Sequence, residues 1–373
     1  DEMERYFHEV PEAIENTLLI ANRCNFNLET NFGYRLPDSN DIPVGDTAQS
    51  YLEKICEEAA VRRYGSLLPH IRNRLNDEFR LIKMHDLAGF FLIYYEVIKI
   101  AREVMIDIGH GSPEIPLEER SPGRGRGSSV SMLVGYLIGL SHIDPLKYGL
   151  NVNRFINEDI ENIPDIDIDF PREIREQLIK RIHQKWGPEH AVLTGMIVTY
   201  KMKSAIRDVA QAFGISSNKI SGNSRSIANA KKTDTDVFNI AKQICGYPKY
   251  LAQHPGGMIL SSSPITNYVP IQPSAIEGRF ICQWDKYSID NAGFAKIDLL
   301  SLGTLSQMHE ILDLIETREG HYIDLSRVDV EDKYVYESLH RGDTIGVFQV
   351  ESAAQIQTIK RIKPMNLNDM AYE

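Results

Sequence analysis

The sequence has 373 residues, of which 42% are hydrophobic and 25% are charged, and its formal net charge is −11. This composition excludes disordered, collagenous and disulfide-rich chains, and the length predicts two or three structural units. The acidic total argues against a uniformly basic nucleic-acid-binding protein, but a local basic surface is enough to bind phosphates.

Neither metal-binding cysteines nor a membrane span are apparent. The chain has four cysteines, and none stands in a C-x-x-C pair: Cys24, Cys56, Cys245 and Cys282. Such spacing argues against a zinc site and favours a reducing, cytoplasmic location. The longest strongly apolar run, Met132 to Leu140, is too short to cross a bilayer, and no secretory signal is visible. Because the chain begins without Met and ends without an evident cap, we expect a segment of a longer protein.

The N-terminal third is predicted to be helical. A polar linker is predicted at 27–44 and a loop at 106–121, from their Pro and Gly content. Pro11 is expected near a helix start, and an interruption is expected near Pro69. Helical periodicity covers residues 2–25, 47–75 and 78–104.

The remainder alternates helical and strand-like segments. Helices are predicted at 131–140, at 171–186, at 203–250 with a break near Gly222, and from 304 onward. A short helix is expected around Asn153, and His254–Gly257 is expected to be a turn. Strands are predicted at 163–170, 192–199, 258–261, 280–283 and 294–299. The fold class is therefore α+β, with helices flanking a small sheet and a helical insertion.

The most specific motif is Pro-Asp-Ile-Asp-Ile-Asp-Phe at 164–170. In a strand, Asp165, Asp167 and Asp169 project from one face while the apolar residues pack on the other. Three like charges on one face repel each other, and a bound Mg²⁺ or Mn²⁺ would relieve that repulsion. Two alternatives stay open at this point. One is a solvated edge strand, and the other is a calcium loop, although Phe170 stands where that loop requires Gly.

A second strand carries Lys296 and Asp298 on one face. If it pairs beside the first strand, Asp298 completes a carboxylate triad and Lys296 adds a cation. That combination suits phosphoryl transfer by two metal ions. By itself, a K-x-D pattern in a strand is common and indicates little.

Two further segments suggest phosphate binding. The loop Gly123–Ser129 alternates Gly with Arg before a helical run, so its N–H groups and the helix start would favour an anion. It is neither a Walker A loop nor a convincing dinucleotide fingerprint, and it equally fits a simple turn. The segment 200–207 is basic and fits either a nucleic-acid contact or a solvated helix face.

Taken in order, the motifs resemble the α subunit of bacterial DNA polymerase III, the C family, and most closely its error-prone branch. They cover nearly the whole chain. The matching segments are GRGS at 125–128, RF at 154–155, PDIDIDF at 164–170, KSAIRDV from 203, HPGG at 254–257, QWDK at 283–286, KID at 296–298 and GVFQVES at 346–352.

The resemblance implies a role for individual residues. Asp165, Asp167 and Asp298 match the family's catalytic aspartates, which bind two Mg²⁺ ions, with Mn²⁺ as an alternative. Asp169 matches a recurring aspartate outside that set. Residues matching the family's triphosphate contacts are Gly127, Ser128, Arg154 and Lys296. Residues falling at the start of the DNA-binding thumb are Lys201, Lys203 and Arg207.

The resemblance also implies a domain plan. The palm resembles that of polymerase β-like nucleotidyltransferases, with a helical thumb inserted into it. The expected order is a connector from an N-terminal PHP domain at 1–29, palm at 30–198, thumb at 199–253, palm again at 254–302, and the start of the fingers at 303–373.

Two functions remain open on this basis. The first is a DNA-directed DNA polymerase core that extends a primer 3′-hydroxyl and works in replication or error-prone repair. Its partners would be primer-template DNA and deoxynucleoside triphosphates, with a sliding clamp and other replication or repair proteins reached through further regions. The alternative is a catalytically incomplete piece that binds nucleotide or DNA without polymerising, since the segment ends before further arginines that the family uses on the nucleotide.

Overall fold

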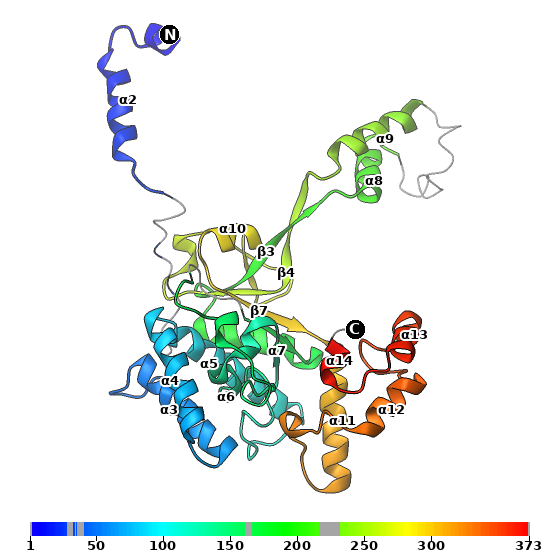
Figure 1. The fold of residues 1–373 in the computed structure, drawn as a ribbon. Coiled ribbons are helices and arrows are strands. Elements are labelled where there is room, and N and C mark those ends of the chain that lie inside the picture. The colour runs from blue at the N-terminus through cyan, green and yellow to red at the C-terminus, as the bar shows by residue number, and fades with distance from the viewer. Residues whose placement is uncertain are drawn as a thin grey trace. The chain divides into compact units, whose positions relative to one another are not determined.

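The computed structural model describes residues 2–27, 33, 35, 41–160, 166–215 and 232–371. These residues divide into two compact units that each combine helices with strands (Figure 1). The first unit contains Asp1–Leu36, Pro188–His254 and Met258–Lys296. The second contains Pro37–Gly187, Pro255–Gly257 and Ile297–Glu373. Within the described ranges, no helix is long and apolar enough to cross a bilayer.

Three helices open the second unit: α3 (Ala48–Tyr64), α4 (Pro69–Met84) and α5 (Ala88–Asp107). Thr47 caps α3 by accepting a hydrogen bond from the Ser50 N–H, and Pro69 is the first residue of α4. The prediction of one helix over 78–104 was wrong, because the chain turns between α4 and α5. Asp86 has a φ of 53°, a left-handed conformation that Asp tolerates better than most residues and that breaks the helix.

Helix α5 forms the core of the second unit. It packs against α3 and against α7 (Arg172–Trp186), and Phe91 and Tyr94 are fully buried. Such a helix, apolar on nearly every side, is stable only inside a protein. The Tyr94 hydroxyl donates to the Ile166 carbonyl over 3.2 Å. Helix α5 therefore fixes the residue that leads directly into the acidic strand.

Three strands pair in the second unit, in the order β1-β2-β7. Strand β2 (Asp167–Phe170) pairs antiparallel with β1 (Arg124–Gly125) and parallel with β7 (Lys296–Ser301). Helix α7 holds this sheet through Arg175, whose Nε donates to the Leu299 carbonyl over 3.0 Å.

Further helices complete the second unit and confirm the helical predictions for 131–140, for the region of Asn153 and for the chain from 304. They are η1 (Gly127–Ser131), α6 (Leu133–Leu137), η2 (Val152–Arg154), α11 (Gly303–Glu319), η6 (Leu325–Arg327), α12 (Lys333–Arg341), α13 (Ala353–Ile362) and α14 (Leu367–Ala371).

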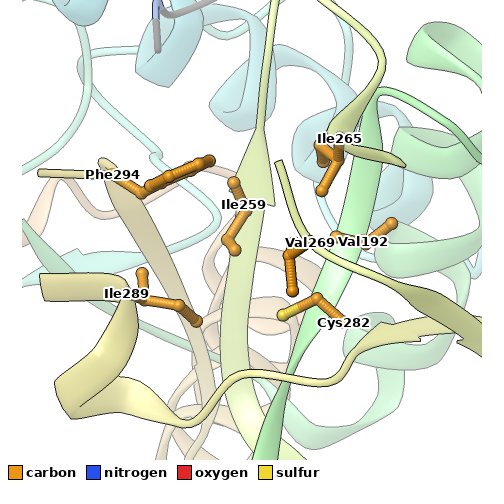
Figure 2. Packing of buried hydrophobic residues seen from close by; sticks show 7 residues of the cluster. All are labelled: Val192, Ile259, Ile265, Val269, Cys282, Ile289 and Phe294. Atoms are coloured by element: carbon orange, nitrogen blue, oxygen red, sulfur yellow. The ribbon is translucent and has the colours of Figure 1, made fainter. Parts of the chain in front are cut away.

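Four strands pair in the first unit, in the order β4-β3-β6-β5, with parallel and antiparallel pairs. Figure 2 shows its core, where buried side chains from the strands meet those of the loops and of helix α10, among them Val192, Ile259, Cys282 and Phe294. The elements are β3 (Ala191–Thr199), β4 (Pro248–Leu260), η5 (Ile265–Asn267), β5 (Ile271–Pro273), β6 (Phe280–Cys282) and α10 (Lys286–Asn291).

Helices α8 (Met202–Ala212) and α9 (Lys232–Ile244) lie at the end of the ribbon formed by β3 and β4 (Figure 1). The predicted helical region 203–250 ends too late, because the chain is already in β4 at Pro248 and Tyr250 pairs with Val198. The predicted break near Gly222 lies outside the described residues.

Two other predictions concern proline. Residues 2–25 form two helices, α1 (Glu2–Tyr6) and α2 (Glu12–Arg23), and Pro11 directly precedes the second, near a helix start as expected. The predicted turn at His254–Gly257 was wrong, since these residues lie within β4. The β3–β4 register shifts next to them, in keeping with the missing N–H of Pro255.

Candidate active site

Strand β2 carries the acidic motif, and its side chains alternate as predicted. Asp167 and Asp169 are partly exposed, whereas Ile168 and Phe170 are fully buried. The apolar residues therefore fix the strand, and the carboxylates share the opposite face. The first aspartate of the motif, Asp165, lies outside the described residues.

Strand β7 lies directly beside β2, as the second motif required. The two strands run parallel, and Asp298 is the register partner of Asp167. Side chains at paired positions of neighbouring strands point to the same face, so these two carboxylates face the same side of the sheet. Asp298 is only 6% exposed, and Lys296, two positions earlier on β7, is only 5% exposed.

A third metal ligand is not established by these residues. Among the side chains that the structure describes, no group of three His, Cys, Asp or Glu residues is arranged to hold a metal ion. With Asp165 outside that range, the carboxylate triad stays a prediction, while the adjacent placement of Asp167 and Asp298 is an observation.

The glycine–arginine loop supplies a cation to the acidic strand. The Arg126 N–H donates to the Asp167 carbonyl over 3.2 Å, which continues the β1–β2 ladder by one residue. The Arg126 guanidinium lies 3.5 Å from the Asp167 carboxylate and 3.6 Å from that of Asp169. The pKa of Asp169 is raised above its usual value, chiefly by burial. The positive charge of Arg126 opposes this shift, and the negative charge of Asp167 adds to it.

The three glycines of the loop serve different purposes. A Cβ on Gly123 would lie 2.8 Å from Ile168, and one on Gly125 would lie 2.6 Å from the Leu140 carbonyl oxygen. These two glycines permit close packing. Gly127 has a φ of 72° and open space around its Cβ position, so it makes the left-handed turn into η1. Of the three, Gly127 alone offers an approach from solvent, and it adjoins exposed Ser128.

The N-terminus of helix α6 is already occupied by a carboxylate. Fully buried Glu78 accepts hydrogen bonds from the Leu133 and Val134 N–H groups, each over 2.9 Å, and from Arg74 over 2.6 Å. Arg74 also donates to the Ser131 carbonyl over 2.6 Å. Since Glu78 fills the favourable anion position of this helix, an incoming phosphate would have to bind upstream, at η1.

The other predicted contacts occupy exposed positions. Arg154 is exposed on η2, which packs against η1. In the first unit, Lys201, Lys203 and Arg207 are exposed on or next to α8. The opposite face of α8 packs on α9 through a buried cluster: Ala205, Val209, Ala210, Val237 and Ala241. These three cations therefore form a solvent-facing basic surface.

Sequence reasoning missed Glu78 and the pairing of Arg126. The available signal for Glu78 was an acidic residue beside Phe79 on the apolar side of a predicted helix. For Arg126, alternation along an extended segment would have placed it opposite an aspartate, but nothing in the sequence specifies that the loop pairs with this strand.

The chain matches one protein family over most of its length. Residues 50–301 match the bacterial DNA polymerase III alpha NTPase domain, and residues 304–373 match the bacterial DNA polymerase III alpha subunit finger domain.

Two curated relatives illustrate the similarity. The chain is 33% identical to error-prone DNA polymerase 2 of Agrobacterium fabrum over 391 residues, which cover 100% of the chain and 34% of that protein. It is 35% identical to error-prone DNA polymerase of Cutibacterium acnes over 383 residues, covering 100% of the chain and 32% of that protein. The chain thus spans about a third of the length of these relatives. The predicted resemblance is confirmed, and the chain belongs to the bacterial DNA polymerase III alpha subunit family.

Proposed function

We propose that this chain is the catalytic core of a DNA-directed DNA polymerase that works in replication or error-prone repair. The observation that carries the proposal is the parallel pairing of β2 and β7, which puts Asp167 and Asp298 side by side. An open glycine–serine turn follows the strand on the other side of β2. Acidic groups beside an exposed phosphate-binding turn suit nucleotidyl transfer.

The donor set fits a divalent cation. Carboxylate oxygens are the ligands that Mg²⁺ and Mn²⁺ prefer, and the position of the Arg126 guanidinium beside Asp167 and Asp169 supports a cation at this face. Asp165, Asp167 and Asp298 would hold two Mg²⁺ ions, with Mn²⁺ as an alternative. When bound, such ions activate the attacking hydroxyl and neutralise charge on the leaving phosphates.

The chain's own residues would orient the nucleotide and the DNA. We assign triphosphate binding to Gly127, Ser128, Arg154 and Lys296. The open space at Gly127 supports the assignment of Gly127 and Ser128. Glu78 already fills the N-terminus of α6, so a phosphate would bind upstream of that helix, at η1. Contacts with the duplex backbone are assigned to Lys201, Lys203 and Arg207, whose exposure supports a phosphate contact.

The domain plan belongs to the same proposal. We assign a polymerase β-like palm to 30–198 and 254–302, a thumb to 199–253 and the start of the fingers to 303–373. The finger-domain match at 304–373 supports the last of these assignments. Primer-template DNA and deoxynucleoside triphosphates would be the substrates. Clamp and other replication or repair proteins would bind regions beyond this chain, and the cytoplasm would be its location.

The span of the chain favours one alternative function. Because it covers about a third of the relatives' length, the chain would bind nucleotide or DNA without extending a primer if groups from other regions are required.

Two assays on one sample separate the functions. Binding of a fluorescent deoxynucleoside triphosphate is titrated with and without Mg²⁺, and extension of a labelled primer-template is followed under the same conditions. Mg²⁺-dependent binding with extension supports the polymerase, whereas binding without extension supports the alternative. Absence of Mg²⁺-dependent nucleotide binding and of extension, with the protein folded, would contradict the polymerase and leave DNA binding as the only form of the alternative.

A further inference from the structure

Arg126 holds an unusual position among the charged groups of the second unit. Its backbone N–H is fixed to the Asp167 carbonyl by a 3.2 Å hydrogen bond, yet its side chain is 52% exposed. Register places Arg126 opposite Asp167 on the neighbouring strand, and Asp169 lies diagonally from it. Residues at these positions lie on the same face of a sheet, so the guanidinium and both carboxylates share one surface.

The geometry is that of a shared counter-ion, not of a fixed salt bridge. The guanidinium nitrogens lie 3.5 Å from Asp167 and 3.6 Å from Asp169. Charge-assisted hydrogen bonds of the bidentate kind are shorter, about 2.7–2.9 Å. For comparison, Arg74 lies 2.6 Å from buried Glu78 in the same unit and is only 18% exposed. Arg126 can therefore leave the carboxylates and become solvated without breaking a tight pair.

We propose that Arg126 is an exchangeable counter-ion of this acidic face, which partly neutralises Asp167 and Asp169 in the metal-free protein and competes with an incoming divalent cation for them. This inference rests on the proposed function, because it takes Asp167 to be a metal ligand. The guanidinium and the cation cannot both occupy the space in front of Asp167 without strong repulsion. Metal binding must consequently displace the side chain, while the backbone bond keeps the loop in register with β2.

The consequence is measurable without any catalytic turnover. Removing the positive charge of Arg126 should raise the affinity for a divalent cation, since the cation no longer displaces a counter-ion. Partly exposed ion pairs are weak, so the expected gain is modest, roughly 2- to 5-fold. If Arg126 instead served only to clamp the loop to the strand, its loss would leave the affinity unchanged or lower it.

The test is a Mn²⁺ titration followed by electron paramagnetic resonance, without nucleotide or DNA. The parent is compared with Arg126→Gln, with Arg126→Lys, and with Arg72→Gln as a charge-matched control. Arg72 is similarly exposed, at 56%, and pairs with Glu57 at 4.0 Å. Circular dichroism establishes that each variant is folded, and Arg126→Lys supplies a conservative replacement that retains the charge.

We expect Arg126→Gln to bind Mn²⁺ more tightly, while Arg126→Lys and Arg72→Gln stay within about twofold of the parent. Unchanged or weaker binding by Arg126→Gln would overturn the inference, and so would an equal gain in Arg126→Lys or Arg72→Gln. An Asp167→Asn variant tests the metal site separately from the role of Arg126. If Asp167→Asn binds Mn²⁺ as the parent does, the proposed metal site itself is wrong. If it loses binding, the metal site is supported, and an unchanged affinity of Arg126→Gln would refute only the role of Arg126.

Discussion

Buried Glu78 gives a sharp prediction, because its carboxylate joins helix α4 to the segment that follows the proposed phosphate-binding turn at Gly127 and Ser128. It accepts hydrogen bonds from two α6 N–H groups and from Arg74, and it is fully buried. In Glu78→Ala, both N–H groups lose their partner and Arg74, only 18% exposed, loses its countercharge. Breaking a buried pair in this way costs about 3–5 kcal/mol.

The neutral isostere should cost less. Glu78→Gln retains one oxygen acceptor but turns an NH₂ group toward one backbone N–H, so a loss of about 1–3 kcal/mol is expected. Glu57→Ala is the control, since Glu57 is half-exposed and 4.0 Å from Arg72. Its change should be within about 0.5 kcal/mol. Urea unfolding at pH 7, followed by circular dichroism, gives these free energies. Equal stability of Glu78→Ala and Glu57→Ala would refute the reasoning.

The pH dependence supplies an internal check on the same residue. Burial raises the pKa of Glu78 above its usual 4.5, although the two α6 amides and Arg74 oppose the shift. With the folded pKa above the unfolded one, the native state holds the proton more firmly, so the contribution to stability is full below pH 4.5 and is lost as the pH rises through the folded pKa. The margin of the parent over Glu78→Gln should therefore be larger at pH 4 than at pH 7.

Three further predictions concern the turn, the core and the basic surface. Gly127→Ala should cost about 1–2 kcal/mol in urea unfolding, from its left-handed φ, and Gly125→Ala should cost more because its Cβ would meet the Leu140 carbonyl oxygen at 2.6 Å. The pKa of buried His309 is lowered from 6.5 to about 3, chiefly by burial, so the unfolded chain takes up the proton first and stability falls as the pH drops below 6.5. Between pH 7 and pH 5 the parent should lose about 2 kcal/mol more than His309→Leu; equal losses would contradict this assignment. Lys203→Ala and Arg207→Ala should each weaken duplex binding and reduce the salt-dependence slope by about 1, as measured by fluorescence anisotropy. An unchanged slope would exclude a phosphate contact.

Short-range patterns predicted the parts of the fold that depend on neighbouring residues. The alternation of Asp167, Ile168 and Asp169 specifies which face of β2 is buried, because a strand has a period of two. The pairing of β7 with β2 was stated only as a condition, because the two strands are far apart in the sequence. The acidic residues Asp167 and Asp298 were the only reason to consider it. Proline likewise marked the start of α2 and the interruption near Pro69, where α4 begins.

Features set by tertiary contacts escaped prediction. At Tyr250, pairing with Val198 outweighs the local helical pattern, and no sequence window contains that partner. The turn at Asp86 interrupts a continuous apolar pattern through a single left-handed residue. Glu78 and Arg126 have clear roles only because distant segments bring backbone N–H groups and carboxylates to them.

The most direct test of the central claim is single-turnover primer extension with Mg²⁺ by the parent and by Asp298→Asn. Asp107→Asn is the matched control, because Asp107 is 58% exposed and pairs with Arg181 on the surface. Loss of a group that acts in the transition state should slow extension by at least about 10²-fold in Asp298→Asn. The Asp107→Asn rate should equal that of the parent, with all three proteins folded. Extension by Asp298→Asn at the parental rate would contradict the assignment of the paired aspartates to catalysis.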